Sequence, residues 1–203
     1  MSNIILFITI ILLWMIIIMA KIIQTLKGEV FMTPTTTQDY ISLGQEHAVT
    51  FGKTQLTLKP GILAEGDPLP CTKGLVSHNL LPGYCIPGIK KQIIVVPSLD
   101  TPVCEWQVKD YSDRLKSAGS HSTRAVYVLS MDTPFAQARF IREHDIHPGI
   151  IFVSDYACRQ FLDNSGLKIN ELSIFARALI ECDENNVVTR VSVPRDITHL
   201  PVY

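Results

Sequence analysis

A short apolar run that leads directly into a helix-starting turn constrains the fold of this chain more than any other feature. Residues 92–96 read Gln-Ile-Ile-Val-Val, the β-branched and apolar composition of a buried strand. Beyond the turn, Cys104, Val108, Tyr111 and Leu115 recur at helical spacing. The sequence therefore predicts a strand–turn–helix unit.

The turn places a cysteine where its sulfur can become a thiolate. Pro102 suits the first helical position, and Thr101 before it is a favourable N-cap. Cys104 then lies in the first helical turn, close to unpaired backbone N–H groups and the positive end of the helix dipole, which stabilise a thiolate. The alternative is a small buried cysteine that only packs. The strand–turn–helix setting favours a reactive Cys104.

Strands and helices alternate through the rest of the chain. Further strands are predicted at residues 125–129, 149–153, 177–180 and 187–191. Between them we expect a helix that starts at Pro134 and another near residues 156–162. This alternation predicts an α/β layer structure with a central sheet.

Two β-hairpins are also predicted. Alternating runs at residues 48–51 and 54–58 are joined by Gly-Lys, and Gly52 can supply the positive φ of a type II′ turn. The last two predicted strands suggest a second hairpin across residues 183–186.

Three stretches of the chain resemble one family. Residues 97–104, Pro-Ser-Leu-Asp-Thr-Pro-Val-Cys, fit the Pro-x-x-x-Thr-x-x-Cys pattern of peroxiredoxins and resemble their thiol peroxidase branch in particular. Residues 130–140 and 176–186 are similar to that branch's second motif and to its arginine-bearing strand with the following turn. The resemblance covers roughly residues 46–203 and implies a thioredoxin-like α/β fold with an N-terminal β-hairpin.

The resemblance also implies a peroxidase site without a cofactor. Cys104 would attack a hydroperoxide and become a sulfenic acid. Thr101 would place its hydroxyl beside the sulfur and the peroxide, Pro97 would shield the site, and Arg177 would favour the thiolate and polarise the O–O bond. Arg139 has no assigned role, and we expect it in a surface salt bridge.

The chain departs from the family where a second cysteine would resolve the sulfenic acid. Thiol peroxidases usually carry that cysteine directly after the Arg-Phe of the second motif, and here Ile141 stands there. The other cysteines match no family position: Cys71, Cys85, Cys158 and Cys182. We predict one-Cys behaviour, with Cys104 reduced by thioredoxin or a small thiol. Whether one of the other four cysteines resolves Cys104 stays open.

Charge and cysteine usage exclude several classes of protein. The formal net charge is −1 and no Lys/Arg cluster is present, so nucleic acid is not an expected partner. Five cysteines without a Cys-x-x-Cys pair argue against a disulfide framework and fit a reducing compartment. Cys71, His78 and Cys85 match no zinc spacing, so no metal site is predicted.

The N-terminus predicts a membrane anchor. Residues 4–20 form an apolar run of 17 residues in which Thr9 is the only polar member. As a helix this run would be about 26 Å long, near the thickness of a bilayer's hydrocarbon core. A cleaved signal peptide would need a positive start and a small-x-small cleavage site, and a buried soluble helix would need covering on every face. We predict a transmembrane helix within residues 1–25, a linker over 26–45 and the catalytic domain over 46–203.

Two features bear on how this domain is placed. Lys21 and Lys27 follow the apolar run, which predicts a cytoplasm-facing domain, with the periplasmic face as the alternative. The family usually ends in an amphipathic helix, whereas this sequence stops at Tyr203. We therefore expect bare sheet surface for a partner subunit, the linker or the bilayer to cover. The homodimer that the resemblance implies is left open.

These features leave three hypotheses for the function. The preferred one is a membrane-anchored peroxidase that reduces hydrogen peroxide and organic or lipid hydroperoxides. The second is a peroxide sensor or relay that passes oxidation from Cys104 to a partner protein. The third is a structural membrane protein without activity, against which the joint presence of Pro97, Thr101, Cys104 and Arg177 argues.

Overall fold

The computed structural model describes residues 33–43, 48–85, 87–118 and 123–203. Within this part, Pro34–Tyr203 form one unit. Its helices and strands, in chain order, are β1 (Thr36–Thr37), β2 (Tyr40–Ile41), β3 (Ala48–Phe51), β4 (Thr54–Thr57), β5 (Val76–Ser77), β6 (Lys90–Val95), α2 (Pro102–Ala118), β7 (Arg124–Ser130), α3 (Pro134–Glu143), β8 (Ile150–Ser154), α4 (Gln160–Ser165), β9 (Ala178–Cys182), β10 (Val188–Pro194) and β11 (Leu200–Pro201).

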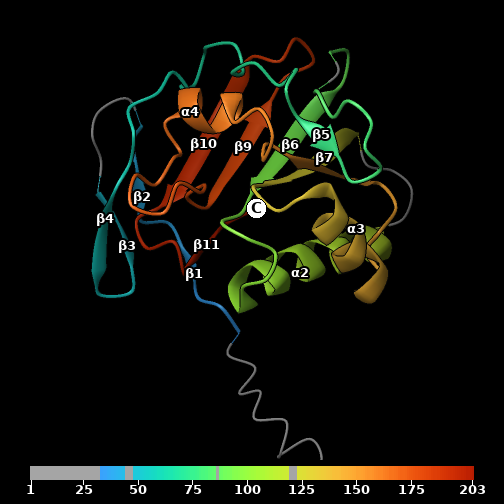
Figure 1. The fold of residues 1–203 in the computed structure, drawn as a ribbon, viewed down its shortest axis with the longest axis horizontal. Helices are drawn as coiled ribbons and strands as arrows, with labels where there is room; N and C mark the ends of the chain where they lie inside the picture. The colour runs from blue at the N-terminus through green and yellow to red at the C-terminus, as the bar shows by residue number, and fades with distance from the viewer. Residues whose placement is uncertain (1–32, 44–47, 86, 119–122) are drawn as a thin grey trace, which may run out of the picture. The chain divides into compact units, whose positions relative to one another are not determined.

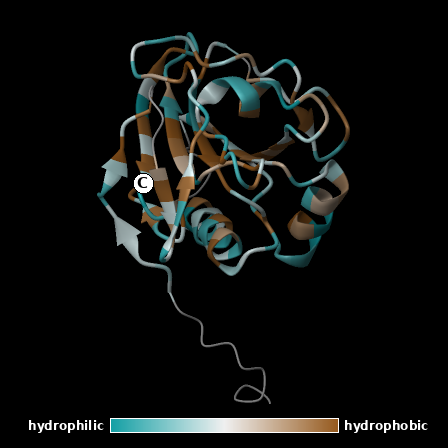
Figure 2. Ribbon diagram, turned by 60° about the vertical axis from the view of Figure 1, so that its left-hand side comes forward, coloured by the Kyte–Doolittle hydropathy of each residue, from teal (hydrophilic) through white to brown (hydrophobic). Residues whose placement is uncertain are grey.

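A seven-stranded mixed sheet forms the centre of this unit. Its strand order is β2-β10-β9-β6-β7-β8-β5. Strands β6, β7 and β8 run parallel, and the neighbouring pairs on either side of them are antiparallel. The β-branched run of β6 lies between β9 and β7 and is almost entirely buried, as its composition predicted. The central strands are accordingly the most hydrophobic part of the ribbon (Figure 2).

Helices cover both faces of the sheet (Figure 1). The connections β6–α2–β7 and β7–α3–β8 join parallel neighbours, and successive right-handed crossovers place both helices on one face. Ile94 of β6 packs on that face with Val108 of α2 and Phe140 of α3. Helix α4 covers the opposite face. The predicted α/β layering is therefore confirmed.

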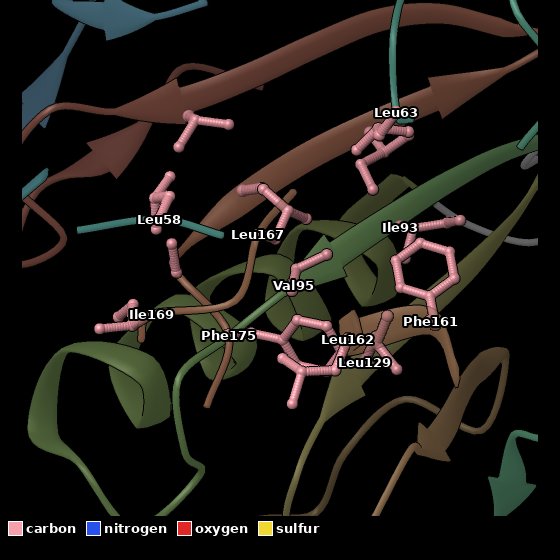
Figure 3. Packing of buried hydrophobic residues seen from close by; sticks show 14 of the residues in the cluster. Leu58, Leu63, Ile93, Val95, Leu129, Phe161, Leu162, Leu167, Ile169 and Phe175 are labelled. Atoms are coloured by element: carbon pink, nitrogen blue, oxygen red, sulfur yellow. The ribbon is translucent and has the colours of Figure 1, made fainter. Parts of the chain in front are cut away.

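The opposite face holds the larger apolar cluster (Figure 3). Ile93 and Val95 alternate with Ile94 along β6 and point into this cluster, because side chains of a strand alternate between its two faces. Phe161 of α4 packs edge-on against Phe175, with ring centroids 6.1 Å apart. The chain that follows α4 is thereby fixed on the sheet up to the start of β9.

Both predicted hairpins are present. Strands β3 and β4 pair antiparallel, and Gly52 between them has a φ of +59°, as the Gly-Lys turn predicted. Strands β9 and β10 pair antiparallel across the predicted turn. That turn is held by Asp183, whose Oδ1 accepts hydrogen bonds from the backbone N–H groups of Asn185 and Val187 at 2.9 and 2.8 Å.

The helix expected near residues 156–162 is shifted along the chain. It begins at Gln160, and residues 156–158 form a turn instead. Arg159 takes a left-handed backbone conformation with a φ of 58°, which no helix residue can have. The carboxylate of Asp155 accepts a hydrogen bond from the N–H of Leu162 at 2.7 Å and so stabilises the later start.

The predicted linker over residues 26–45 is wrong in its second half. β1 pairs parallel with β11, and β2 pairs antiparallel with β10. The edge of β10 offers unpaired backbone groups that the Tyr-containing β2 satisfies, and the Thr-containing β1 does the same for β11. The folded unit therefore starts at Pro34 rather than at residue 46.

The predicted transmembrane helix of residues 1–25 lies outside the described residues. Within the described residues, every helix is too short or too polar to span a bilayer.

Candidate active site

Cys104 and Arg177 meet where β6 ends and the neighbouring strand β9 begins. Cys104 is the third residue of α2, which follows the end of β6 and begins at Pro102 as predicted. Arg177 directly precedes β9, whose first residue, Ala178, pairs with the last residue of β6, Val95. The antiparallel pairing thus brings residues 73 positions apart to one edge of the sheet. Arg177 Nη2 donates a hydrogen bond to Cys104 Sγ at 3.2 Å.

The guanidinium of Arg177 is buried without a carboxylate. Its relative exposure is 1%, and that of Cys104 is 0%. Arg177 Nε donates to the carbonyl of Ile197 at 2.8 Å, and Nη1 donates to Gln107 Oε1. Among the described residues, no acidic side chain lies within ion-pair distance of Arg177. A buried charge is costly unless it is paired, so the geometry favours Cys104 as a thiolate.

The loop that leads into α2 is tied to the second sequence motif. Asp132 accepts hydrogen bonds from the Ser98 hydroxyl and from the backbone N–H of Leu99, both at 2.8 Å. Pro97 is buried at the start of this loop, and its shielding role stays a prediction. Arg139 pairs with Asp100 at 2.8 Å on the exposed side. The expected surface salt bridge of Arg139 is confirmed.

The hydroxyl of Thr101 has a different contact from the predicted one. Thr101 Oγ1 donates to the carbonyl of Ser98 at 3.1 Å, and the Thr101 carbonyl accepts from the N–H of Glu105 at 2.9 Å. In the described part of the chain, this hydroxyl makes no hydrogen bond to Cys104 Sγ. Thr101 is exposed and lies three residues before Cys104. Its role beside the peroxide stays a prediction.

Two of the other cysteines are buried and unreactive. Burial, together with the neighbouring Cys182, raises the pKa of Cys85 to about 12. Burial likewise raises the pKa of Cys182 to about 11, partly offset by Lys91. Cys182 ends β9 and Arg177 directly precedes it, so about 17 Å of extended strand separates Cys182 from Arg177. Both side chains are therefore neutral thiols near neutral pH.

The remaining candidates for a resolving residue lie elsewhere. Cys71 and Cys158 are exposed. Cys158 lies in the turn before α4, on the sheet face opposite α2. Ile141 packs against the apolar cluster that contains Cys104. The structure thus brings Cys104 and Arg177 together, and in the part of the chain that it describes no other cysteine forms a hydrogen bond with either of them.

Three contributors to the site were not predicted from the sequence. Gln107 is fully buried on α2, three residues after Cys104. A polar residue on the apolar face of the predicted helix is a pattern from which a role in the site could have been predicted. Asp132 lies in the second motif, residues 130–140, but the motif alone does not indicate its contacts with Ser98 and Leu99. The carbonyl of Ile197 carries no sequence signal, because any residue would supply the same group.

Known proteins share both the sequence and the fold of this chain. Residues 83–203 match the Redoxin family. A thiol peroxidase of Clostridium acetobutylicum is 37% identical over 156 residues, which cover 76% of this chain and 92% of that protein. A thiol peroxidase of Staphylococcus saprophyticus is 33% identical over 157 residues, which cover 75% of this chain and 91% of that protein.

Solved structures agree with these relatives. A peroxiredoxin-like protein from Aquifex aeolicus superposes with a TM-score of 0.70 at 32% identity, covering 77% of this chain and 91% of that one. A thiol peroxidase from Chromobacterium violaceum superposes with a TM-score of 0.64 at 23% identity, covering 77% of this chain and 90% of that one. At this identity the similarity supports only the fold. The predicted thioredoxin-like fold with an N-terminal hairpin is thereby confirmed. The chain belongs to the Redoxin family, in its thiol peroxidase branch.

Proposed function

We propose that this chain is a thiol peroxidase that reduces hydroperoxides at Cys104 and so contributes to antioxidant defence. The observation that carries this proposal is the 3.2 Å contact between the buried Arg177 guanidinium and Cys104 Sγ. The thiolate attacks one peroxide oxygen and the O–O bond breaks. The bonding electron pair leaves on the other oxygen, which takes up a proton to become water or an alcohol. The sulfur, oxidised by two electrons, becomes a sulfenic acid.

Arg177 serves both halves of this step. Its charge stabilises the attacking thiolate, and a guanidinium is always protonated, so it can also stabilise the negative charge that develops on the leaving oxygen. The hydrogen bonds of Arg177 to Ile197 and Gln107 fix it before the peroxide arrives. Such preorganisation lowers the reorganisation needed in the transition state.

Turnover then depends on an external thiol. A thiol condenses with the sulfenic acid, releases water and leaves a mixed disulfide, which a second thiol reduces. The packing of Ile141 at the family's usual resolving position and the raised pKa values of Cys85 and Cys182 support this one-Cys cycle. Thioredoxin, which has two thiols, or a small thiol in two steps would fit this role.

The apolar run of residues 4–20 supports anchoring of the enzyme in a membrane. The lysines that follow it favour a domain on the cytoplasmic side. Protease treatment of sealed membrane vesicles tests this orientation. Digestion of the domain from the outer side would refute it.

A redox relay is the second candidate, favoured by the lack of a cysteine at residue 141. Steady-state peroxide consumption by the full chain separates the two functions, with thioredoxin and a small thiol compared as reductants. A peroxidase consumes many equivalents of peroxide, and Cys104→Ser consumes none. Consumption that stops after about one equivalent with every reductant would favour the relay. Equal consumption by Cys104→Ser would refute the assignment of the nucleophile.

A further inference from the structure

Two nitrogens of Arg177 do not contact the sulfur. One donates to the segment of residues 197–203, and the other donates to a side chain beside that segment. Nε donates to the carbonyl of Ile197, at the start of this segment, at 2.8 Å. Nη1 donates to Gln107 Oε1 on α2. The segment then returns to α2 at Tyr203, next to Gln107. The orientation of Arg177 therefore depends on what fixes Gln107.

Tyr203 packs against α2 with its hydroxyl toward Gln107. Its ring lies edge-on to that of Tyr111, with centroids 5.2 Å apart and an interplanar angle of 72°, and the guanidinium of Arg114 lies 5.4 Å from its centroid. Burial raises the pKa of Tyr203, and the nearby Gln107 amide lowers it in part. By distance and angle, the buried Gln107 Nε2 and Tyr203 hydroxyl have no partner among the described residues. Each is thus the available partner of the other.

The charges around Tyr203 come from two elements. Asp110 and Arg114 of α2 form an ion pair of 2.8 Å, and Arg177 acts on Tyr203 from the start of β9. A row of side chains therefore runs from Tyr203 through Gln107 and Arg177 to Cys104. Its members are a hydroxyl, an amide, a guanidinium and a thiol.

The backbone before Tyr203 is itself fixed by the segment that begins the folded unit. The N–H of Leu200 donates to the carbonyl of Thr35 at 2.9 Å. The N–H of Val202 donates to the Tyr40 hydroxyl at 3.0 Å. These contacts limit where the ring of Tyr203 can lie, so its hydroxyl is presented to Gln107 from a defined position.

We propose that Tyr203 is a positioning residue for peroxide reduction: its hydroxyl holds Gln107, so that Gln107 holds Arg177 against Cys104. This inference rests on the proposed function of Cys104 and deepens it. Without the hydroxyl, the Gln107 amide is free to turn and Arg177 loses a fixed acceptor. The thiolate is then less stabilised, although the apolar packing of the ring is unchanged.

The test compares single variants of the full chain. Tyr203→Phe keeps the ring on Tyr111 and removes only the hydroxyl. We expect the rate constant of Cys104 with hydrogen peroxide to fall about two- to ten-fold at neutral pH, the effect of one hydrogen bond. The pH of half-maximal rate should rise while the melting temperature stays close to that of the parent. Tyr84→Phe, which removes the hydroxyl of an exposed tyrosine, should leave both the rate and its pH profile unchanged.

A double-mutant cycle shows whether Tyr203 acts through Gln107. In a Gln107→Leu background, Tyr203→Phe should cause no further slowing, because coupled residues are not additive. The inference is overturned if Tyr203→Phe matches the parent in rate and pH profile, or if it slows Gln107→Leu by the same factor as the parent. A parent protein whose Cys104 does not react with peroxide would instead overturn the proposed function itself.

Discussion

Replacing Arg177 by methionine removes the charge next to Cys104 while keeping a long side chain. In the parent, Arg177 Nη2 lies 3.2 Å from Cys104 Sγ, and both residues are buried. Methionine cannot donate to the sulfur or stabilise charge on the leaving oxygen. It also leaves the carbonyl of Ile197 and the Gln107 amide without their donors. We therefore expect both slower chemistry and lower stability.

The magnitude follows from the contact itself. A hydrogen bond that involves a charged group contributes about 1.5–3 kcal/mol, which corresponds to roughly a 10- to 150-fold loss in rate. Coulomb's law for two unit charges at this separation with an effective dielectric constant of about 20 gives about 5 kcal/mol, which sets a ceiling of roughly several thousand-fold. Each unsatisfied buried acceptor should lower the free energy of unfolding by about 1–3 kcal/mol.

Stopped-flow fluorescence of Trp106, two residues after Cys104 on α2, measures the reaction with peroxide under single-turnover conditions. Arg139→Met is the matched control, because it removes an exposed arginine that pairs with Asp100. Exposed pairs contribute about 0–1 kcal/mol, so the control should stay within about five-fold of the parent. The reasoning is refuted if Arg177→Met reacts as fast as Arg139→Met at every pH tested.

Two further predictions concern the loop and the buried thiols. Asp132→Ala leaves the Ser98 hydroxyl and the Leu99 N–H without their acceptor, so thermal denaturation should show a loss of about 1–3 kcal/mol per group, with slower peroxide reduction. A variant with the parent's melting temperature and rate would contradict this account of the loop. Burial raises the pKa of Cys85 from 9.0 to about 12, so the unfolded chain loses this proton at a lower pH than the folded one. Stability should fall as pH rises from about 9 to about 12, and less steeply in Cys85→Ala. Chemical denaturation across this range with identical slopes for the two proteins would show that Cys85 does not titrate as stated.

Local patterns predicted the elements that surround the site better than the contacts within it. The β-branched run of β6 and the Thr-Pro start of α2 placed Cys104 correctly, because both signals lie in adjacent residues. Arg177 could be assigned only through the family resemblance, since its approach to Cys104 depends on the register of β9 against β6. The carbonyl of Ile197 could not be predicted at all, because backbone groups leave no trace in side-chain patterns.

Local patterns also failed to predict the short strands within the predicted linker. β1 and β2 have two residues each and no measurable periodicity. They become strands only because β10 and β11 offer backbone partners that are distant in sequence. Tertiary context decides the structure of such short segments. The late start of α4 has a local cause instead, because the N–H of Leu162 donates a hydrogen bond to the carboxylate of Asp155, seven residues earlier.

Mass spectrometry of the reduced full chain after one equivalent of hydrogen peroxide, with a trap for sulfenic acid, tests the central claim most directly. The account predicts trapping at Cys104 in the parent and none in Cys104→Ser, although the exposed Cys71 and Cys158 are still present in that variant. Trapping at another cysteine, or the same trapping in Cys104→Ser, would contradict it. A quantitative intramolecular disulfide at Cys104 would instead contradict the one-Cys cycle.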